Sequence, residues 1–246
     1  MLTPLGGLLK SVPAVSDNQQ SFDIILLLAT DTSGKSGSIT LARVTPGQRD
    51  VEIVEVVPLA GGTFSAQLVP QISALLEKHG YRKSDLAGFA VVSGPGSFTG
   101  LRVGLAAIKA LAEVLRKPIA AISLLEAVAR SGPARGRMRA ALDAGRGEVY
   151  VGDYQDDSQA HRERLLSREE FLTESNGKSV ITPDPALAAI ARAAGIQVDQ
   201  ISYPDSRVIA RLGWSRLERG QTVSPEALDA NYIRRSDAEI FSKPKV

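Results

Sequence analysis

A glycine-rich segment, Val91-Val-Ser-Gly-Pro-Gly-Ser-Phe-Thr-Gly-Leu-Arg102, holds the residues best suited to bind an anion. It follows an apolar run and precedes apolar residues at helical spacing, so it predicts a strand that turns sharply into a helix. Backbone amides at the start of such a helix, aided by the helix dipole, can hold a phosphate. The candidate nucleotide-binding residues in this loop are Gly94, Gly96, Ser97, Thr99 and Gly100.

The spacing of these glycines fits neither common phosphate-binding pattern. A Walker A loop ends in Gly-Lys-Ser/Thr, whereas Gly100 is followed by Leu101. The Rossmann fingerprint has one residue fewer between its second and third glycines than separates Gly96 from Gly100. Two roles therefore stay open, a phosphate site and a tight structural connection that needs glycine for close packing. Thr99 is a candidate N-cap of the helix, and Ser97 takes that role if the helix starts earlier.

A second candidate site follows the first apolar run of the chain. Asp31, Thr32 and Ser33 offer a carboxylate and two hydroxyls, which can hold a Mg²⁺-bound phosphate or a water. The structural alternative is an Asx turn with hydroxyl caps. Together with the glycine-rich loop, these residues would form a degenerate nucleotide site. ATP or ADP with Mg²⁺ is the candidate ligand, and no cofactor is firmly indicated.

Several catalytic chemistries are excluded by residue content. The chain has no cysteine, which removes disulfides, thiolate metal sites, iron–sulfur clusters and cysteine nucleophiles. Its two histidines, His79 and His161, are far apart and neither has a ligand-spaced neighbour, so a metallopeptidase is not indicated. A triad of Ser97, His79 and Asp31 lacks the nucleophile-elbow motif. The sequence therefore assigns no catalytic residue and no metal ligand.

Size and composition are those of an ordinary globular protein. The 246 residues, of which 43% are hydrophobic and 23% charged, predict one large domain or two small ones with a real core. The 29 basic and 27 acidic side chains give a net charge of +2, which gives no electrostatic case for wrapping nucleic acid. The most apolar run, Ile24–Ala29, is far shorter than the ~20 residues that cross a membrane. We therefore expect a cytoplasmic protein with no membrane association.

The elements that position the two candidate sites form a meander followed by helices. An apolar run at Phe22–Thr30 predicts a buried strand, and alternation at Ser38–Val44 and Val51–Val57 predicts two more in an antiparallel meander. Helical spacing from Phe64 to His79 predicts the first long helix. The segments that follow alternate between strand and helix, which implies parallel pairing with helices packed on the sheet. They are Gly88–Ser93, Thr99–Arg116, Ile119–Ser123 and Leu124–Arg130.

The second half repeats this layout without repeating the sequence. After a linker at Pro133–Gly136, a hairpin is predicted from Arg137–Ala144 and Glu148–Tyr154, with helices at Pro185–Ala194 and Ser206–Arg219. The predicted domains are a flexible N-terminal extension at 1–21, a first lobe at 22–132 and a second lobe at 133–246. The sequence leaves open whether the final helical segment packs back on the first lobe.

Three segments resemble the TsaB (YeaZ) family in residues, order and spacing. They are Leu28-Ala-Thr-Asp-Thr-Ser33, Ser93-Gly-Pro-Gly-Ser-Phe-Thr-Gly-Leu-Arg102 and Leu142-Asp-Ala-Gly-Arg-Gly-Glu-Val-Tyr150. The resemblance spans about Ile24 to Arg235, where the late Pro225–Arg234 segment looks like the family's closing Pro…Tyr-Leu-Arg. It implies an α/β fold of the actin/Hsp70-like (ASKHA) class, with duplicated lobes, mixed sheets with an antiparallel meander, and flanking helices.

The resemblance also implies a function. The family serves the formation of threonylcarbamoyladenosine beside the anticodon of tRNAs that read codons starting with A. There TsaB is the partner of the catalytic TsaD, which carries metal-binding histidines, and the ATPase TsaE joins the pair. The implied role is a non-catalytic dimerisation and scaffold subunit that forms a homodimer when alone and meets tRNA indirectly. The alternative is an ASKHA nucleotide phosphotransferase or hydrolase that uses Asp31. Older glycoprotease-like (M22) naming is not supported by the histidine content.

Two predicted helices carry more apolar residues than one core face requires. The candidate partner-interface residues on them are Leu68, Ile72, Leu75, Ala106, Ala107, Ala110 and Leu111. The small residues among them would let partner helices approach closely. The resemblance implies the same surface for TsaD and for a second copy, so the two partners should compete.

Overall fold

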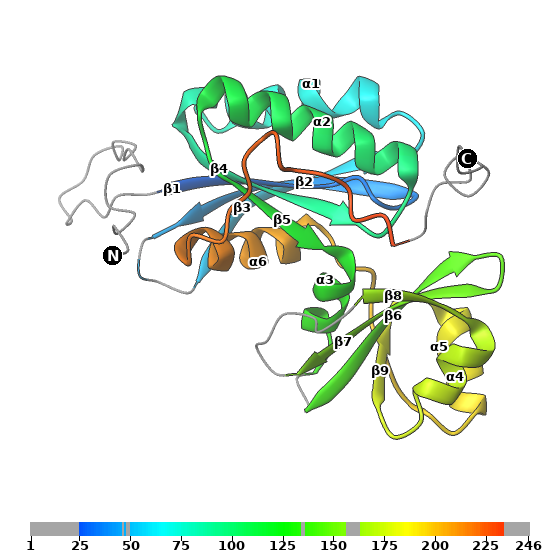
Figure 1. The fold of residues 1–246 in the computed structure, drawn as a ribbon. Coiled ribbons are helices and arrows are strands. Elements are labelled where there is room, and N and C mark those ends of the chain that lie inside the picture. The colour runs from blue at the N-terminus through cyan, green and yellow to red at the C-terminus, as the bar shows by residue number, and fades with distance from the viewer. Residues whose placement is uncertain (1–24, 46, 48–49, 134–135, 156–162, 234–246) are drawn as a thin grey trace, which may run out of the picture. The chain divides into compact units, whose positions relative to one another are not determined.

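The computed structural model describes residues 25–45, 47, 50–133, 136–155 and 163–233. The predicted N-terminal extension at 1–21 and His161 lie outside the described residues. Contacts divide the chain into two units, drawn in Figure 1. Unit 1 comprises the chain up to Ile122 together with Asp205–Asp229, and unit 2 comprises Ser123–Pro204 with the chain from Ala230 onward. This division assigns residues 123–132 to unit 2, whereas the sequence-based boundary falls after residue 132.

Unit 1 is built on a five-stranded mixed sheet. Its strands are β1 (Ile25–Asp31), β2 (Ser36–Val44), β3 (Val51–Ala60), β4 (Leu86–Gly94) and β5 (Ile119–Ser123). They lie in the order β3-β2-β1-β4-β5, with β1 to β3 as an antiparallel meander and β4 parallel to β1. Every residue of β1 and β4 is buried, as expected for central strands covered on both faces.

Helices cover both faces of the unit 1 sheet. Helices α1 (Phe64–Lys78) and α2 (Phe98–Leu115) lie on one face and α6 (Ser206–Glu218) on the other, and a short 3₁₀ turn, η1 (Lys83–Asp85), precedes β4 (Figure 1). Helix α6 approaches closely because a Cβ at Gly213 would lie 2.3 Å from the Cβ of Ala90. Its first residue is fixed by buried hydroxyls, since the Ser206 amide donates to Ser38 Oγ at 3.0 Å. The late helix is therefore part of unit 1.

Unit 2 repeats the architecture of unit 1. Its elements are α3 (Leu124–Ser131), β6 (Arg137–Gly145), β7 (Glu148–Gln155), β8 (Glu163–Ser167), α4 (Arg168–Glu174), β9 (Ser179–Thr182), α5 (Pro185–Ala193) and β10 (Gln197–Gln200). The sheet order is β10-β9-β6-β7-β8, with β6 to β8 antiparallel and β9 parallel to β6. Read from β8, this is the strand order of unit 1. The expected fold class, two mixed sheets in duplicated ASKHA-like lobes, is confirmed.

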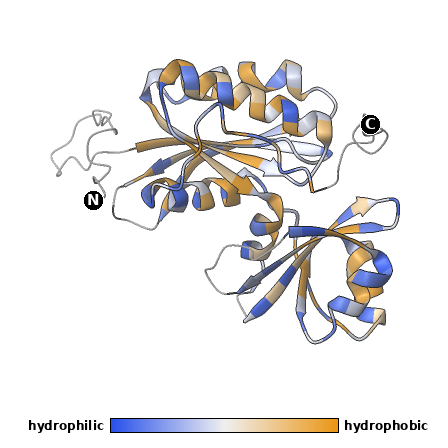
Figure 2. Cartoon of the chain, viewed as in Figure 1, coloured by the Kyte–Doolittle hydropathy of each residue, from blue (hydrophilic) through white to orange (hydrophobic). Residues whose placement is uncertain are grey.

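Hydrophobic patterning explains these layers, and Figure 2 shows hydrophobic residues along the central strands and alternation with hydrophilic ones on the helices. Sequence patterning missed four short elements, because it assigned nothing between Tyr154 and Pro185 or between Ala194 and Ser206. Strands β8, β9 and β10 have only five, four and four residues. Helix α4 carries a capping box in which Ser167 and Glu170 bond each other's backbone amides, a signal that the sequence does contain.

None of the helices in the described part of the chain has the length and apolar composition needed to cross a membrane.

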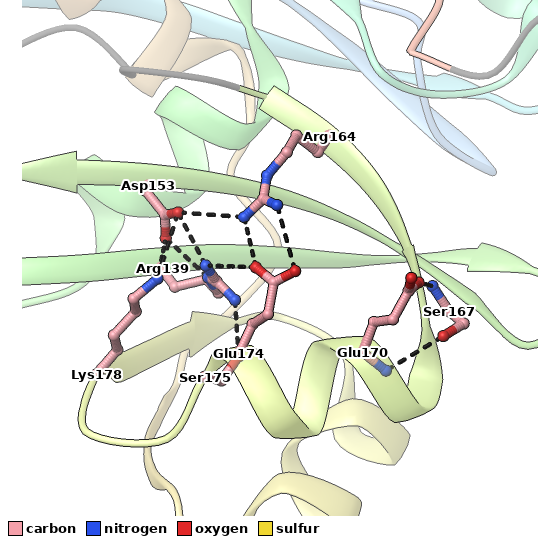
Figure 3. Close-up of polar contacts among 8 residues, drawn as sticks. All are labelled: Arg139, Asp153, Arg164, Ser167, Glu170, Glu174, Ser175 and Lys178. Carbon is pink, nitrogen blue, oxygen red and sulfur yellow. Dashed lines mark hydrogen bonds and ion pairs between the residues drawn. The ribbon is translucent and has the colours of Figure 1, made fainter.

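A charged cluster in unit 2 joins β6, β7, β8 and the end of α4 (Figure 3). Arg139 is fully buried and binds Asp153 through two hydrogen bonds of 2.7 and 2.8 Å. Arg164 pairs with Glu174 at 2.6 Å, and Lys178 lies 3.4 Å from Asp153. Burial alone would raise the pKa of Asp153, but the hydrogen bonds and charges of Arg139 and Lys178 outweigh burial and hold that pKa below its ordinary value.

We expect Arg139→Ala to destabilise unit 2 by about 3 kcal/mol, because it removes the bidentate partner of a half-buried carboxylate. Arg137→Ala is the matched control, since Arg137 is exposed on the same strand. A carboxylate whose pKa is lowered in the folded state adds to the free energy of unfolding. That contribution is complete at a pH above the ordinary carboxyl pKa, and it is lost as the pH falls through the folded-state pKa. The stability difference between wild type and Arg139→Ala, measured by urea unfolding, should therefore narrow in acid. Equal losses in both variants would contradict this account.

Candidate functional site

The glycine-rich loop connects the end of β4 to the start of α2. Gly94 ends the strand with φ of 129°, a conformation that a residue with a Cβ rarely adopts. The side chain of Ser97 accepts a hydrogen bond from the Gly100 amide at 3.3 Å and caps α2. The cap is therefore Ser97 rather than Thr99, which is exposed within the first turn. The early-start alternative left open by the sequence is the one adopted.

This loop packs directly against the turn that follows β1, so the two candidate segments lie together. The Ser97 amide donates to the Ser33 carbonyl at 2.7 Å, and Thr32 Oγ1 donates to the Gly100 carbonyl at 2.7 Å. A Cβ at Gly96 would lie 2.6 Å from the Ser33 carbonyl oxygen, and one at Gly100 would lie 2.1 Å from that of Thr32. Real Cβ atoms do not approach this closely, so these two positions require glycine.

Asp31 is buried behind this contact, with 4% of its surface exposed. Its Oδ1 accepts hydrogen bonds from the Ser33 amide at 2.8 Å and from Ser33 Oγ at 2.6 Å, which is the Asx turn considered as the structural alternative. Burial raises the pKa of Asp31, the two hydrogen bonds from Ser33 oppose that rise, and the nearby Asp205 carboxylate adds to it. The carboxylate thus holds the turn, and its environment disfavours its charged form.

The loop as it stands fits a structural connection better than a phosphate cradle. Of the amides at the start of α2, that of Ser97 is taken by the Ser33 carbonyl and that of Gly100 by Ser97 Oγ. A phosphate at this helix start would have to displace bonds that the chain already makes with itself.

The described residues contain no group of three or more His, Cys, Asp or Glu side chains that could hold a metal ion. The described histidine, His79, follows the last turn of α1 and lies 2.7 Å from Glu55 Oε2 through its Nε2 atom. Lys78 binds the other oxygen of the same carboxylate at 2.7 Å. This histidine therefore helps to join α1 to the edge strand β3.

The predicted partner-interface residues fall into two groups. Leu68, Ile72 and Leu75 on α1 are at most 2% exposed and fill the core of unit 1, so they are not on the surface that a partner would meet. On α2, Ala106 and Ala110 are exposed, whereas Ala107 and Leu111 are half-buried. The sequence expectation therefore combined core residues of α1 with surface residues of α2.

The structure adds exposed apolar residues that the sequence reading missed. Val114 is 80% exposed one turn beyond Ala110, and Val69 is 43% exposed on α1. We call Val69, Ala106, Ala110 and Val114 the helix face. The signal was present in the sequence, because positions 106, 110 and 114 are spaced by four along one helix. At the start of the same row the Arg102 guanidinium stacks on the Phe98 ring, 3.7 Å from its centroid.

Comparison with known proteins gives a family match over half of the chain. Residues 56–181 match the model of the protein family described as "TsaD: tRNA N6-adenosine threonylcarbamoyltransferase". The matched region runs from β3 through the glycine-rich loop and the β6–β7 hairpin to β9.

Curated relatives and a solved structure extend this similarity. The chain is 37% identical over 130 residues to the tRNA threonylcarbamoyladenosine biosynthesis protein TsaB of Bacillus subtilis, covering 52% of this chain and 55% of that protein. It is 25% identical over 227 residues to the TsaB protein of Escherichia coli, covering 86% of this chain and 96% of that protein. YeaZ from Pseudomonas aeruginosa has the same fold, with a TM-score of 0.65 at 22% identity, over 85% of this chain and 99% of that one.

The contact between the loop and the β1 turn predicts that adding one methyl group at Gly100 lowers the stability of the protein. We expect Gly100→Ala to lower the free energy of unfolding by about 2–3 kcal/mol, because its Cβ would be forced against the Thr32 carbonyl. Thr99→Ala, at the exposed neighbouring position, should change stability by less than about 0.5 kcal/mol. Chemical denaturation of both variants checks the difference, and a Gly100→Ala protein as stable as wild type would refute the close contact.

The same contact predicts that the isolated chain does not bind ATP with Mg²⁺. Isothermal titration calorimetry of the wild type should give no heat of binding. Binding that is abolished by Ser97→Ala or Asp31→Asn at an unchanged melting temperature would overturn the structural role of the loop.

Proposed function

Because this chain belongs to the "TsaD: tRNA N6-adenosine threonylcarbamoyltransferase" family and, within it, to TsaB (YeaZ), we propose that it serves tRNA threonylcarbamoyladenosine biosynthesis. In this proposal it is a non-catalytic scaffold subunit of the cytoplasm that binds a TsaD-like catalytic subunit. A TsaE-like ATPase joins the pair, tRNA is met through the complex, and the chain forms a homodimer when alone.

The helix face is the observation that carries the scaffold role. Helices α1 and α2 lie side by side on one face of the unit 1 sheet and contact each other (Figure 1). Core packing uses the sheet-facing side of α2, with Leu101, Leu105, Ile108 and Ala112 buried. The opposite side presents Ala106, Ala110 and Val114 to solvent, next to the exposed charged residues Arg102 and Glu113.

Small side chains suit this face to helix packing. Alanines at 106 and 110 let a second helix approach to the 8–10 Å axial distance typical of packed helices. The exposed valines, Val69 on α1 and Val114 on α2, add apolar area that a partner could cover. A TsaD-like subunit, or a second copy of this chain, would bury the face by adding helices to it, so the two partners should exclude each other.

The non-catalytic part of the proposal rests on chemistry that the chain lacks. It has two histidines and no cysteine, and the histidines are not spaced as metal ligands. A threonylcarbamoyl transfer would therefore depend on the catalytic partner. The alternative of a nucleotide phosphotransferase would need open phosphate loops, whereas two amides at the start of α2, those of Ser97 and Gly100, already bind the chain's own oxygens.

The proposal predicts that a charge on the helix face prevents assembly. Ala110→Glu should weaken both the homodimer and the complex with a TsaD-like subunit by about 3 kcal/mol, because the interface would bury an unpaired carboxylate. That cost corresponds to a loss of about a hundredfold in affinity. Ala189→Glu is the matched control, because Ala189 is exposed on α5 in unit 2.

Three measurements check the expected loss. Analytical ultracentrifugation follows the homodimer, co-purification follows the TsaD complex, and a tRNA modification assay with the reconstituted subunits follows the activity. Circular dichroism establishes that both variants are folded. If folded Ala110→Glu still dimerises and still binds TsaD, the helix face is not the partner surface. Threonylcarbamoyl transfer by this chain without TsaD would refute the non-catalytic role.

A further inference from the structure

One Asn-Gly pair occurs in the sequence, at Asn176-Gly177. It lies in the turn between α4 and β9 in unit 2, and both residues are exposed. The turn is closed by a hydrogen bond of 3.1 Å from the Lys178 amide to the Ser175 carbonyl. Asn176 therefore occupies a solvent-accessible turn, outside any helix or strand.

The pair is arranged for attack of a backbone nitrogen on a side-chain amide. Such an attack needs a following residue with no bulky side chain and with an amide that is not engaged in a hydrogen bond. Gly177 has φ of +74°, and a Cβ built on it would meet nothing within 4 Å. Among contacts between described residues, neither the Gly177 amide nor the Asn176 side chain takes part in a hydrogen bond.

Asn231 provides a contrast within the same chain. Its side-chain amide donates to Glu163 Oε2, which fixes the amide group in place. The following amide, that of Tyr232, donates to the Ala230 carbonyl at 2.9 Å, and the tyrosine side chain crowds the approach. Both features that leave Asn176 reactive are thus missing at Asn231.

The neighbours of the turn show that the product would be tolerated. Ser175 bonds Arg139 and Lys178 pairs with Asp153, so the charged cluster of Figure 3 flanks the turn on both sides. That cluster contains three cationic side chains and two carboxylates, and a third carboxylate, Glu170, interacts electrostatically with Arg164. A new carboxylate at position 176 would lie between Ser175, which bonds the Arg139 guanidinium, and the Lys178 side chain two residues on, so the nearest charges on both sides of the turn are positive.

We propose that Asn176 is a site of spontaneous deamidation in the folded protein. The Gly177 nitrogen forms a bond to Asn176 Cγ and loses its proton, the Cγ–Nδ2 bond breaks, and ammonia leaves. Water then opens the resulting succinimide at either carbonyl, giving aspartate or isoaspartate. One neutral amide becomes one carboxylate, and no oxidant, metal or enzyme is needed.

Peptide mapping by mass spectrometry after incubation of the purified full chain at mildly alkaline pH tests the proposal. We expect the peptide containing Asn176 to gain the mass of amide-to-acid conversion and to yield isoaspartate, while the peptide containing Asn231 stays unchanged. Isoelectric focusing should show a new band shifted by one negative charge. Asn176→Gln should lose that band, because the longer side chain would have to close a larger and less favourable ring.

Two outcomes would overturn the proposal. In the first, Asn176 stays intact in the folded chain while the urea-unfolded chain converts, which would mean that the turn blocks the attack. In the second, Asn176 and Asn231 convert at equal rates.

The variant Asn176→Asp tests separately whether the folded protein tolerates an aspartate at this position. A melting temperature equal to that of the wild type supports that part of the inference. A large fall in that temperature would contradict the electrostatic part of the inference.

Discussion

Close packing of backbone on backbone between the glycine-rich loop and the Asp31-Thr32-Ser33 turn is the constraint on which unit 1 depends. Carbonyl oxygens of Thr32 and Ser33 occupy the space where Cβ atoms at Gly100 and Gly96 would lie. Hydrogen bonds in both directions then tie the end of β1 to the start of α2. Because β1 is the buried centre of the sheet, this contact fixes where α2 begins and along which line it crosses the sheet.

The position of the helix face follows from that starting point. Once α2 begins at Phe98, with Ser97 as its N-cap, the helical period of 3.6 residues places Leu101, Leu105 and Ile108 against the sheet. Positions 106, 110 and 114 then point away from it, whatever their residue type. Since these positions hold alanine and valine rather than lysine or glutamate, the apolar character of the face is a property of the chosen residues, whereas its solvent exposure is a property of the fold.

Sequence patterning predicted the long elements and the duplicated layout, because strands such as β1 and helices such as α2 have clear periodicity. It missed β8, α4, β9 and β10, whose length is too short for a period to be recognised. It also assigned core residues to the partner interface together with surface residues, because apolar side chains such as Leu68 and Ile72 give the same sequence pattern whether they face a core or a partner. Patterning also could not show which of the chain's own oxygens reach the amides of the loop, because Ser33 is more than sixty residues away from Ser97 in sequence.

The duplicated unit extends the same reasoning to the second half of the chain. In unit 2 the end of β6 repeats the Asx geometry of unit 1, since Asp143 Oδ1 accepts from the Gly145 amide at 3.1 Å, as Asp31 Oδ1 does from the Ser33 amide. The helix that follows the fourth strand of the unit is α5, and its N-cap Asp184 accepts from the amides of Ala186 and Leu187. An anion at that helix start would meet a carboxylate instead of open donors. At each of these two helix starts, two amides are bound by the chain's own side chains or carbonyls, so a phosphate there would compete with hydrogen bonds that the chain already makes.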